Sequence, residues 1–581
     1  MDECVRTYLE DMESEKAVLW SSHKNLALEY MRRRVTELGK KEVKVTHTDW
    51  SLGQFEYVSG GIMSSVIPQD SSWFTLTTYG AGSGKVLGQS FMKRASAEER
   101  KYGSERKEGR ERRKAYKEDI RLLTDTDGAL DFFEYCTQMV LRNFQEAGYY
   151  EAKTECVKDA LCTGVGFLAV EEDIGKSKVW YQCLSPLECC WRPSRDGRVD
   201  SFGRRWKMTA YDIVRHFEGK RIPDEVMKCI REGNAGRIFE VCEVIVPRGV
   251  LFGSDMRKVE FGKPSDPYMF AIWLSEGNEY IQTGSMERMP VTCMVYEHDG
   301  RNQYGRGMVE NAINCIVDLD ELEKERQVIR GRTAFPPVAV HPSYARNVNL
   351  SRNAVNVIPD MANVPVPIQF PDTYTEYAND VEMKKQEVRQ LLFVDVFQTL
   401  LASNDSRRTA TEVTMRKSES AQLMQQAIGN MERVTCTEVM QTLALLMRQG
   451  KIAKPSDEVL ALVPYVTMVF SSSFIQMKNS YWMAEGNVAF LNYIVQLAGV
   501  FPDILDIVDM DVETQMIAVA YGQSQYAIRE KSEVEQIRKN KAEMAQAQLQ
   551  MQQEQQASEI NRNNAQAQAQ MQMQAQGGRM A

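Results

Sequence analysis

Hydrophobic side chains recur at helical spacing in the first part of the chain. Positions that include Val5, Met12 and Leu26 predict one helix over residues 4–38. After this helix the helical period is lost, and we expect a loop-and-strand region that continues to about Thr78. The chain therefore begins with a long amphipathic helix.

The next part combines helices with short hydrophobic runs that are typical of strands. Apolar residues at helical spacing predict helices over residues 129–147, 150–162 and 210–217. Strands are predicted over residues 167–170, 179–184, 202–207, 239–246, 269–274 and 291–296. This mixture indicates a helix-rich chain of the α+β class.

Two long helices on either side of a small β-rich insert form the clearest pattern in the sequence. The first is predicted over residues 305–331, with one apolar side, and Pro336 lies just after its end. Residues 332–377 hold short strands and several prolines. The second helix is predicted over residues 378–402.

The rest of the chain becomes steadily more polar. Residues 403–408 form a polar break, and residues 409–480 predict a helix followed by strands. Helices are expected within residues 481–530. Residues 531–581 are rich in Gln, Ala and Met and lack a sustained heptad of branched apolar residues. We expect this tail to be either a solvated, weakly packing helix or disordered.

Composition narrows the classes of function. The 581-residue chain has 43% hydrophobic residues, enough for real cores, and a formal net charge of -9, which disfavours tight wrapping of nucleic acid. Its twelve cysteines include no C-x-x-C pair, and we find neither a signal peptide nor a long apolar span. We therefore expect a soluble protein made in a reducing cytoplasm, with no membrane contact.

A mixed-charge insertion over residues 93–121 holds twelve basic and seven acidic residues and almost no large apolar side chain. Such a composition cannot bury itself, so we expect a solvated helix or a loop. Contact with nucleic acid is the less favoured interpretation, because acidic residues are interleaved throughout. The sequence does not indicate a role for this insertion.

Several local patterns resemble enzyme motifs but lack essential residues. The glycine-rich run before Lys85 has Tyr79 where a phosphate-binding loop needs its first glycine, and Val86 where it needs Ser or Thr. The acidic residues around Asp127 fit helix capping better than a calcium loop. His298 lies before a turn and has no metal-binding spacing with other histidines. We therefore predict no catalytic, cofactor-binding or metal site, and no enzyme activity.

Short motifs form an ordered set that spans roughly residues 50 to 575. They are Val58, Ser59, Gly60, Gly61, Ile62 and Met63; Trp73, Phe74 and Leu76; Asn143 and Phe144; residues 160–168; Tyr304, Gly305, Arg306 and Gly307; residues 408–413; and the Gln-rich tail. In this order they resemble the head-to-tail connector family of short-tailed double-stranded DNA phages, although Cys162 and Val165 replace more usual residues of that family.

This resemblance implies a portal fold that assembles as a ring. It comprises an α/β wing, a stem of two helices, a β-rich clip, a tunnel loop and a C-terminal helical crown or barrel. The implied parts are the wing at residues 1–304, the first stem helix at 305–331, the clip at 332–377, the second stem helix at 378–402, the tunnel loop at 403–408, a wing return helix and strands at 409–480, crown helices at 481–530 and the tail at 531–581.

The resemblance also implies the function and the site residues. A homo-oligomeric ring, expected to be a dodecamer, would pass double-stranded DNA during packaging and ejection. It would bind the terminase, then tail adaptor or nozzle proteins, and contact major capsid and scaffolding proteins. We expect it at the portal vertex of the virion, after assembly in the host cytoplasm. The implied site residues are the tunnel loop Ser403, Asn404, Asp405, Ser406, Arg407 and Arg408, the channel-facing candidates Gln390, Asp395 and Gln398, and the stem-start motif Tyr304, Gly305, Arg306 and Gly307.

Two other classes stay open at this stage. A different structural protein of the virion, from the tail or the internal core, would share the mixed helix and strand composition. A DNA-processing enzyme would need a metal or nucleophile constellation that the sequence does not display.

Overall fold

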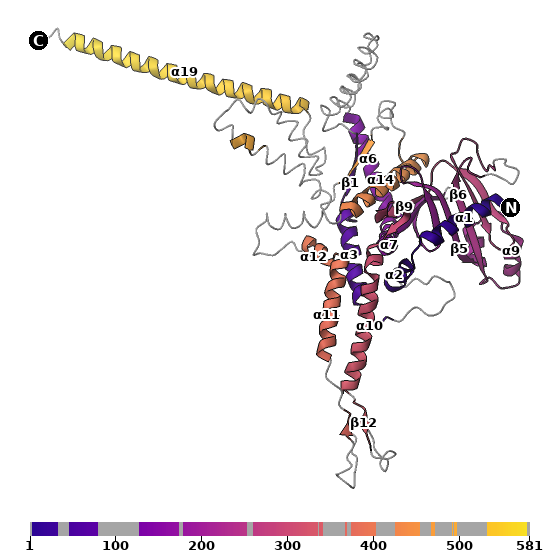
Figure 1. Ribbon diagram of the computed structural model, residues 1–581. Coiled ribbons are helices and arrows are strands. Elements are labelled where there is room, and N and C mark those ends of the chain that lie inside the picture. Colours follow the sequence, from indigo (N-terminus) through magenta and orange to yellow (C-terminus); the bar gives the residue numbers. More distant parts are fainter. Residues whose placement is uncertain are drawn as a thin grey trace, which may run out of the picture. The chain divides into compact units, whose positions relative to one another are not determined.

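A computed structural model describes the chain in segments, which Figure 1 draws as coloured ribbon. The described residues are 3–32, 46–78, 127–173, 178–251, 259–334, 336–340, 366–368, 374–401, 425–453, 466–470, 491, 493–496 and 531–577. The chain divides into two compact units, Met1–Phe490 and Leu491–Ala581, which are treated separately. The insertion at 93–121 and the tunnel loop at 403–408 lie outside the described residues, as do most of 332–377 and of 481–530.

A five-stranded antiparallel sheet forms one layer of the first unit. Its strand order is β4-β5-β6-β7-β8, so that each strand pairs with its neighbour in sequence. The strands are β4 (Cys189–Pro193), β5 (Val199–Thr209), β6 (Ile238–Pro247), β7 (Tyr268–Leu274) and β8 (Tyr280–Met286). The predicted strands at 202–207, 239–246 and 269–274 are confirmed, whereas β4 and β8 were missed.

A second sheet has three antiparallel strands in the order β3-β2-β9. It is followed directly in sequence by a short hairpin that leads to the first long helix. These strands are β2 (Val165–Asp173), β3 (Lys178–Leu184), β9 (Val291–Val295), β10 (Glu297–Asp299) and β11 (Asn302–Arg306). The three strands that the sequence predicts for this sheet are therefore confirmed.

Apolar side chains between the two sheets and on their faces make the core of this α+β part. Phe167 of β2, Trp191 of β4 and Phe202 of β5 are buried together. Two short helices, α8 (Ala210–His216) and α9 (Asp224–Arg231), pack beside β6 and form a separate cluster of buried apolar side chains with it. The hydrophobic faces of the sheets are therefore covered by other parts of the chain.

Helices cover the other face of the three-stranded sheet. α7 (Tyr149–Thr163) packs on β2 and β3, and α6 (Asp127–Glu146) and α14 (Gln425–Arg448) pack beside it. Stacked aromatic rings of Phe144 and Tyr149, 3.8 Å apart, lie at the centre of this layer. The predicted helices at 129–147 and 150–162 are confirmed.

The N-terminal predictions need two corrections. The predicted helix over residues 4–38 was wrong as one element, because α1 (Glu3–Leu19) and α2 (Ser22–Arg32) are separate helices. α1 packs against β4, whereas α2 packs against α7. The loop-and-strand prediction up to Thr78 was also wrong in part, because α3 (Trp50–Val66) occupies much of that region. Strand β1 (Phe74–Thr78) alone fits the prediction, and it pairs with the distant strand β14 (Val466–Phe470).

The long helices lie side by side in the first unit (Figure 1). α10 (Met308–Ala334) descends to a short antiparallel pair, β12 (Val338–Ala339) and β13 (Val366–Pro367), and the chain returns along α11 (Tyr374–Leu391). α12 (Val394–Leu401) follows α11. The described part of the insert between the helices is thus a two-stranded pair.

The described part of the second unit is mainly one helix, α19 (Lys531–Gly577), which is 47 residues long. Its Met544, Met551 and Ile560 are exposed. Of the two expectations for the Gln-rich tail, the structure has the helical one.

Candidate functional site

The stem-start motif, residues 304–307, lies in strand β11 and in the turn before α10. The helix itself begins at Met308, so the predicted start at residue 305 was wrong. Gly305 has a φ of 53°, a left-handed conformation that a right-handed α-helix does not contain. The motif therefore shapes the entry to the helix and is not part of it.

Two glycine-containing segments cross backbone to backbone at this entry. Gly164 ends α7 with a φ of 91°, and a β-carbon there would lie 2.6 Å from the carbonyl oxygen of Tyr304. A β-carbon on Gly307 would lie 2.5 Å from the carbonyl oxygen of Cys162. Contacts this short are sterically forbidden, so only glycine allows the end of α7 to touch the start of α10. The two glycine patterns noted in the sequence are thus two sides of one packing contact.

Lys24 of α2 is buried at this crossing and holds its parts together. Its side chain is 1% exposed, and its ammonium group donates hydrogen bonds to the carbonyl oxygens of Thr163 and, at 2.7 Å, of Gly305. It also lies 2.9 Å from the carboxylate of Glu310 in α10. Burial lowers the pKa of Lys24, against the opposing effect of Glu310. One ammonium group therefore links α2, the end of α7 and the start of α10.

Glu310 caps the first turn of α10 as well as pairing with Lys24. Its carboxylate accepts a hydrogen bond from the backbone N–H of Gly307 at 3.2 Å and from the hydroxyl of Ser21 at 2.5 Å. A glutamate at the third helical position that bonds back to the residue before the helix satisfies an N–H group that would otherwise have no partner. The direction in which α10 leaves the sheets is therefore fixed by several contacts at its first turn.

The upper parts of α10 and α11 pack through a short apolar seam flanked by charges. Val381 and Val388 of α11 and Leu319 of α10 are buried. On the flank, the Lys384 ammonium lies 3.4 Å from the Asp318 carboxylate. Because both flanking groups are partly exposed to water, the apolar seam contributes more to the pairing than the charges do.

The predicted second helix, 378–402, is two helices. α11 begins at Tyr374 and α12 begins at Val394, and Phe393 between them has a φ of 52°. The prediction of one continuous helix was wrong because a left-handed residue ends the helical hydrogen-bond pattern. The N–H of Phe393 bonds instead to the carbonyl of Gln390 at 3.1 Å, which makes a tight turn.

Arg389 spans this break and engages two of the three channel-facing candidates. Its guanidinium donates to the Asp395 carboxylate at 2.6 Å and to the side-chain oxygen of Gln398 at 2.8 Å. Gln390, Asp395 and Gln398 are all exposed. The structure thus places these residues on an accessible surface next to the position where the chain enters the tunnel-loop segment, which lies outside the described residues.

Farther along, the helix pair carries apolar side chains that this chain does not cover. Met383 of α11 is 62% exposed and Val328 of α10 is 47% exposed. Val366 and Ile368 of the short strand pair are likewise exposed. These four exposed side chains lie on α10, α11 and the short strand pair.

A buried ion pair that the sequence analysis missed fixes α14 to the sheets. The Lys153 ammonium lies 2.8 Å from the Glu438 carboxylate, and both side chains are 0% exposed. Glu438 also accepts hydrogen bonds from the Tyr149 hydroxyl at 2.7 Å and the Thr292 hydroxyl at 3.0 Å. All lone pairs of this carboxylate that face the core thus have donors, as a buried charge requires.

Candidate metal ligands are not clustered in the described part of the chain. Among those residues, no cluster of three or more His, Cys, Asp or Glu side chains could hold a metal ion. His298 lies in the β10–β11 hairpin, where burial lowers its pKa. All twelve cysteines are free, and burial raises the pKa of thiols such as Cys136, to about 12. The glycine-rich run from 79 to 86 lies outside the described residues.

The described helices include none that is both long and apolar enough to span a membrane.

Comparisons with known proteins agree on one family. The sequence pattern described as "Bacteriophage head to tail connecting protein" matches residues 111–528. The chain is similar to the probable portal protein of Bordetella phage BPP-1, with 20% identity over 418 residues that cover 70% of this chain and 73% of that protein. It is also similar to the portal protein of Salmonella phage epsilon15, with 22% identity over 358 residues that cover 60% of this chain and 62% of that protein.

Proposed function

This chain belongs to the family of bacteriophage head-to-tail connecting proteins, and we propose that copies of it form the portal ring at one capsid vertex of a phage. The observation that carries the proposal is the projecting helix pair, α10 and α11, whose outer part exposes Val328 and Met383. One chain alone leaves these side chains in water. A neighbouring copy packed alongside would bury them.

A ring follows from repeating one contact around an axis. In such a ring, one side of the helix pair of each copy contacts the opposite side of the helix pair of the next copy, which is a head-to-tail contact. The ring closes if the rotation from one copy to the next is a whole fraction of a full turn. The copies then enclose a central opening. The resemblance to portal proteins favours a dodecamer.

The channel is proposed to be lined by the α11–α12 region and the loop that follows it. Gln390, Asp395 and Gln398 are exposed there, and the tunnel loop at 403–408 comes directly after α12. Arg407 and Arg408 would lie close to DNA phosphates, with Asp405 beside them. Mixed charge in the loop and the net charge of -9 favour weak, salt-sensitive contacts, so that the duplex slides and is not held.

The partners are proposed from the order of the parts. The strand-containing insert at 332–377 would bind the terminase during packaging and tail adaptor or nozzle proteins afterwards. The wing would contact capsid and scaffolding proteins. The segments 481–530 and 531–581 would form the crown and face the capsid interior.

We assign this protein a structural role and assign ATP hydrolysis to the terminase. The chain's glycine-rich run lacks the residues of a phosphate-binding loop, as the sequence shows at Tyr79 and Val86. A nuclease assay with magnesium or manganese tests for the enzymatic alternative. Electron microscopy of the purified chain tests the ring against the second alternative, a different structural protein of the tail or internal core.

A further inference from the structure

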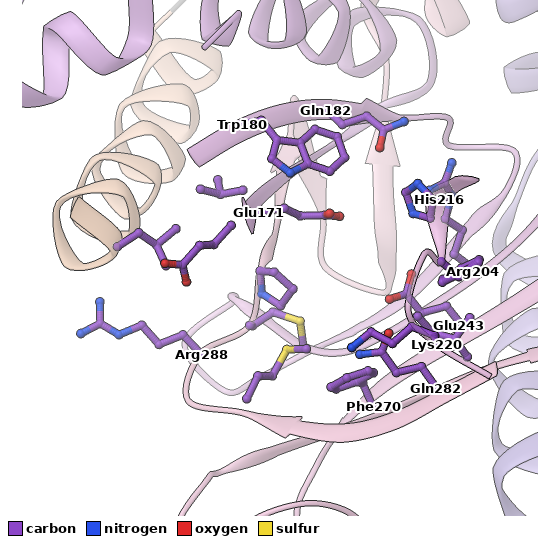
Figure 2. Close-up of a pocket in the computed structure, with 18 of the residues that line it drawn as sticks. Glu171, Trp180, Gln182, Arg204, His216, Lys220, Glu243, Phe270, Gln282 and Arg288 are labelled. Carbon is purple, nitrogen blue, oxygen red and sulfur yellow. The ribbon is translucent and has the colours of Figure 1, made fainter. Parts of the chain in front are cut away.

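A groove of about 1660 Å³ opens between the two sheets of the first unit, and no residue of the helix pair lines it. Its walls come from both sheets, from α8 and the residues after it, and from α14. Figure 2 shows the carboxylates of Glu171, from β2, and Glu243, from β6, directed into this space. The groove is therefore acidic at its centre.

These two carboxylates have no hydrogen bond or ion pair with any residue that the structure describes. Arg204 is close enough to influence both, but its guanidinium bonds to Glu188 at 3.1 Å and lies over the Trp206 ring at 4.5 Å. Two partly desolvated carboxylates without a cation are costly in a folded protein. Within the described residues neither carboxylate therefore has an ion-pair partner, although Arg204 and Lys220 also line the groove.

The walls around these carboxylates suit an organic cation. Trp180 and Phe270 face the groove from opposite sheets (Figure 2). Aromatic rings next to carboxylates favour a guanidinium or ammonium group, which gains charge pairing and ring contact together. A hard metal ion would need more oxygen ligands than the two carboxylates supply.

The size of the groove favours a protein segment as occupant. Pockets for small molecules usually measure about 300–1000 Å³, which is less than this groove. The chain itself carries basic side chains of the required kind. Arg195, Arg221, Arg231 and Arg301 are exposed and form no ion pair within the described segments. In a ring, every groove would have an identical neighbour able to supply such a residue.

We propose that this groove receives an arginine or lysine side chain from a neighbouring copy of the chain, so that Glu171 and Glu243 obtain their cation only in the assembly. The inference rests on the proposed ring. It adds a second contact between copies, in the wing, to the one between helix pairs.

Association through the groove depends on pH. Burial, with the nearby Glu171 charge, raises the pKa of Glu243 to about 7. The other charged or titratable groups that line the groove with it are Glu172, Arg204, Asp212, Arg215, His216, Glu218, Lys220, Glu287, Arg288 and Arg448, and burial lowers the pKa of His216. A bound cation favours ionised Glu243, so its pKa is lower in the assembly than in the free subunit. Association therefore releases a proton, strengthens as pH rises through about 7 and weakens below it.

The test compares the full-length wild type with the double variant E171Q/E243Q by sedimentation and electron microscopy between pH 5.5 and 8.5. Glu287→Gln, an exposed carboxylate at the groove rim, is the matched control. We expect the double variant to weaken subunit association at least tenfold at pH 8 and to lose the pH dependence, while the control behaves as wild type. The subunit's thermal midpoint should not fall, because glutamine removes a desolvated charge.

A second measurement identifies the occupant. A photoreactive benzoylphenylalanine replaces Gln282 in the groove wall, and rings are assembled from mixed ¹⁴N- and ¹⁵N-labelled chains. Cross-linked peptides of mixed isotope that contain Arg or Lys support the proposal. Cross-links only within one chain, or none, overturn it. If E171Q/E243Q associates as strongly as the wild type and keeps its pH dependence, the proposal is overturned but the proposed ring is not. If the wild type forms no rings, the proposed function itself is refuted.

Discussion

The Lys153 ammonium and the Glu438 carboxylate lie 2.8 Å apart with both side chains fully buried, and they join residues far apart in the sequence. The pair connects α7 to α14, the first described helix after residues 402–424. Together with the hydrogen bond from Thr292, the pair holds α14 against α7 and β9.

Glu438→Gln should destabilise the subunit by about 3–5 kcal/mol, because it leaves Lys153 charged and uncompensated in the core. Denaturant unfolding of the unassembled chain at fixed protein concentration measures this. Glu146→Gln, which removes one partner of the exposed Arg142 pair, is the control and should leave the midpoint unchanged. Equal effects of the two changes would contradict the role of the buried pair.

Gly307→Ala should prevent correct folding, since its β-carbon would lie 2.5 Å from the Cys162 carbonyl oxygen. Gly331→Ala is the control. Gly331 is an exposed residue near the end of α10, and a β-carbon there would meet no atom within 4 Å. There alanine should increase stability by about 0.5–1 kcal/mol through its higher helix propensity. The soluble yield and thermal midpoint of the two variants distinguish a steric effect from an effect of helix propensity. If alanine is tolerated at position 307, the close contact between the end of α7 and the start of α10 is contradicted.

The sequence predicts the long helices and most central strands because their hydrophobic periods are strong. It fails at α3, where Gly53, Gly60 and Gly61 lower helix propensity. The fold explains the helix, since a β-carbon on Gly61 would lie only 3.1 Å from the ring of Phe397, so the glycine lets α12 pack closely. Tertiary contact outweighs local propensity here.

The break between α11 and α12 at Phe393 and the buried position of Lys24 could not be predicted either, because both depend on tertiary contacts. An apolar residue inside an apolar helical pattern gives no signal that its φ is positive. Lys24 lies in a polar stretch that is typical of a solvated helix face, yet it is 1% exposed because carbonyl groups from distant segments surround it. The apolar pattern predicted the helix after Tyr304 but placed its start at residue 305, which lies in β11 before α10 begins.

Val328→Asp should leave the isolated subunit as stable as wild type but prevent ring assembly. The side chain is exposed in the single chain, whereas in the proposed ring the new carboxylate would be buried against a neighbour without a partner. Val18→Asp is the matched control, since Val18 is 85% exposed and lies outside the helix pair. Sedimentation velocity should show subunits for the first variant and rings for the second; rings in both would exclude Val328 from the interface.

Replacing Arg407 and Arg408 together by alanine should preserve ring assembly and alter DNA packaging or retention. Each lost phosphate contact reduces the salt dependence of the interaction with DNA. Counting full and empty heads, and measuring DNA retention at increasing salt, checks the assignment. Normal yields of stable, full heads would count against a channel position for these residues.

The central claim is that copies of this chain close into a hollow ring through their paired helices. Electron microscopy of the purified full-length protein, with particles averaged along the symmetry axis, tests it most directly. We predict annular particles with an axial opening wide enough for a DNA duplex. Filaments, shells, or subunits that never associate at high concentration would contradict it.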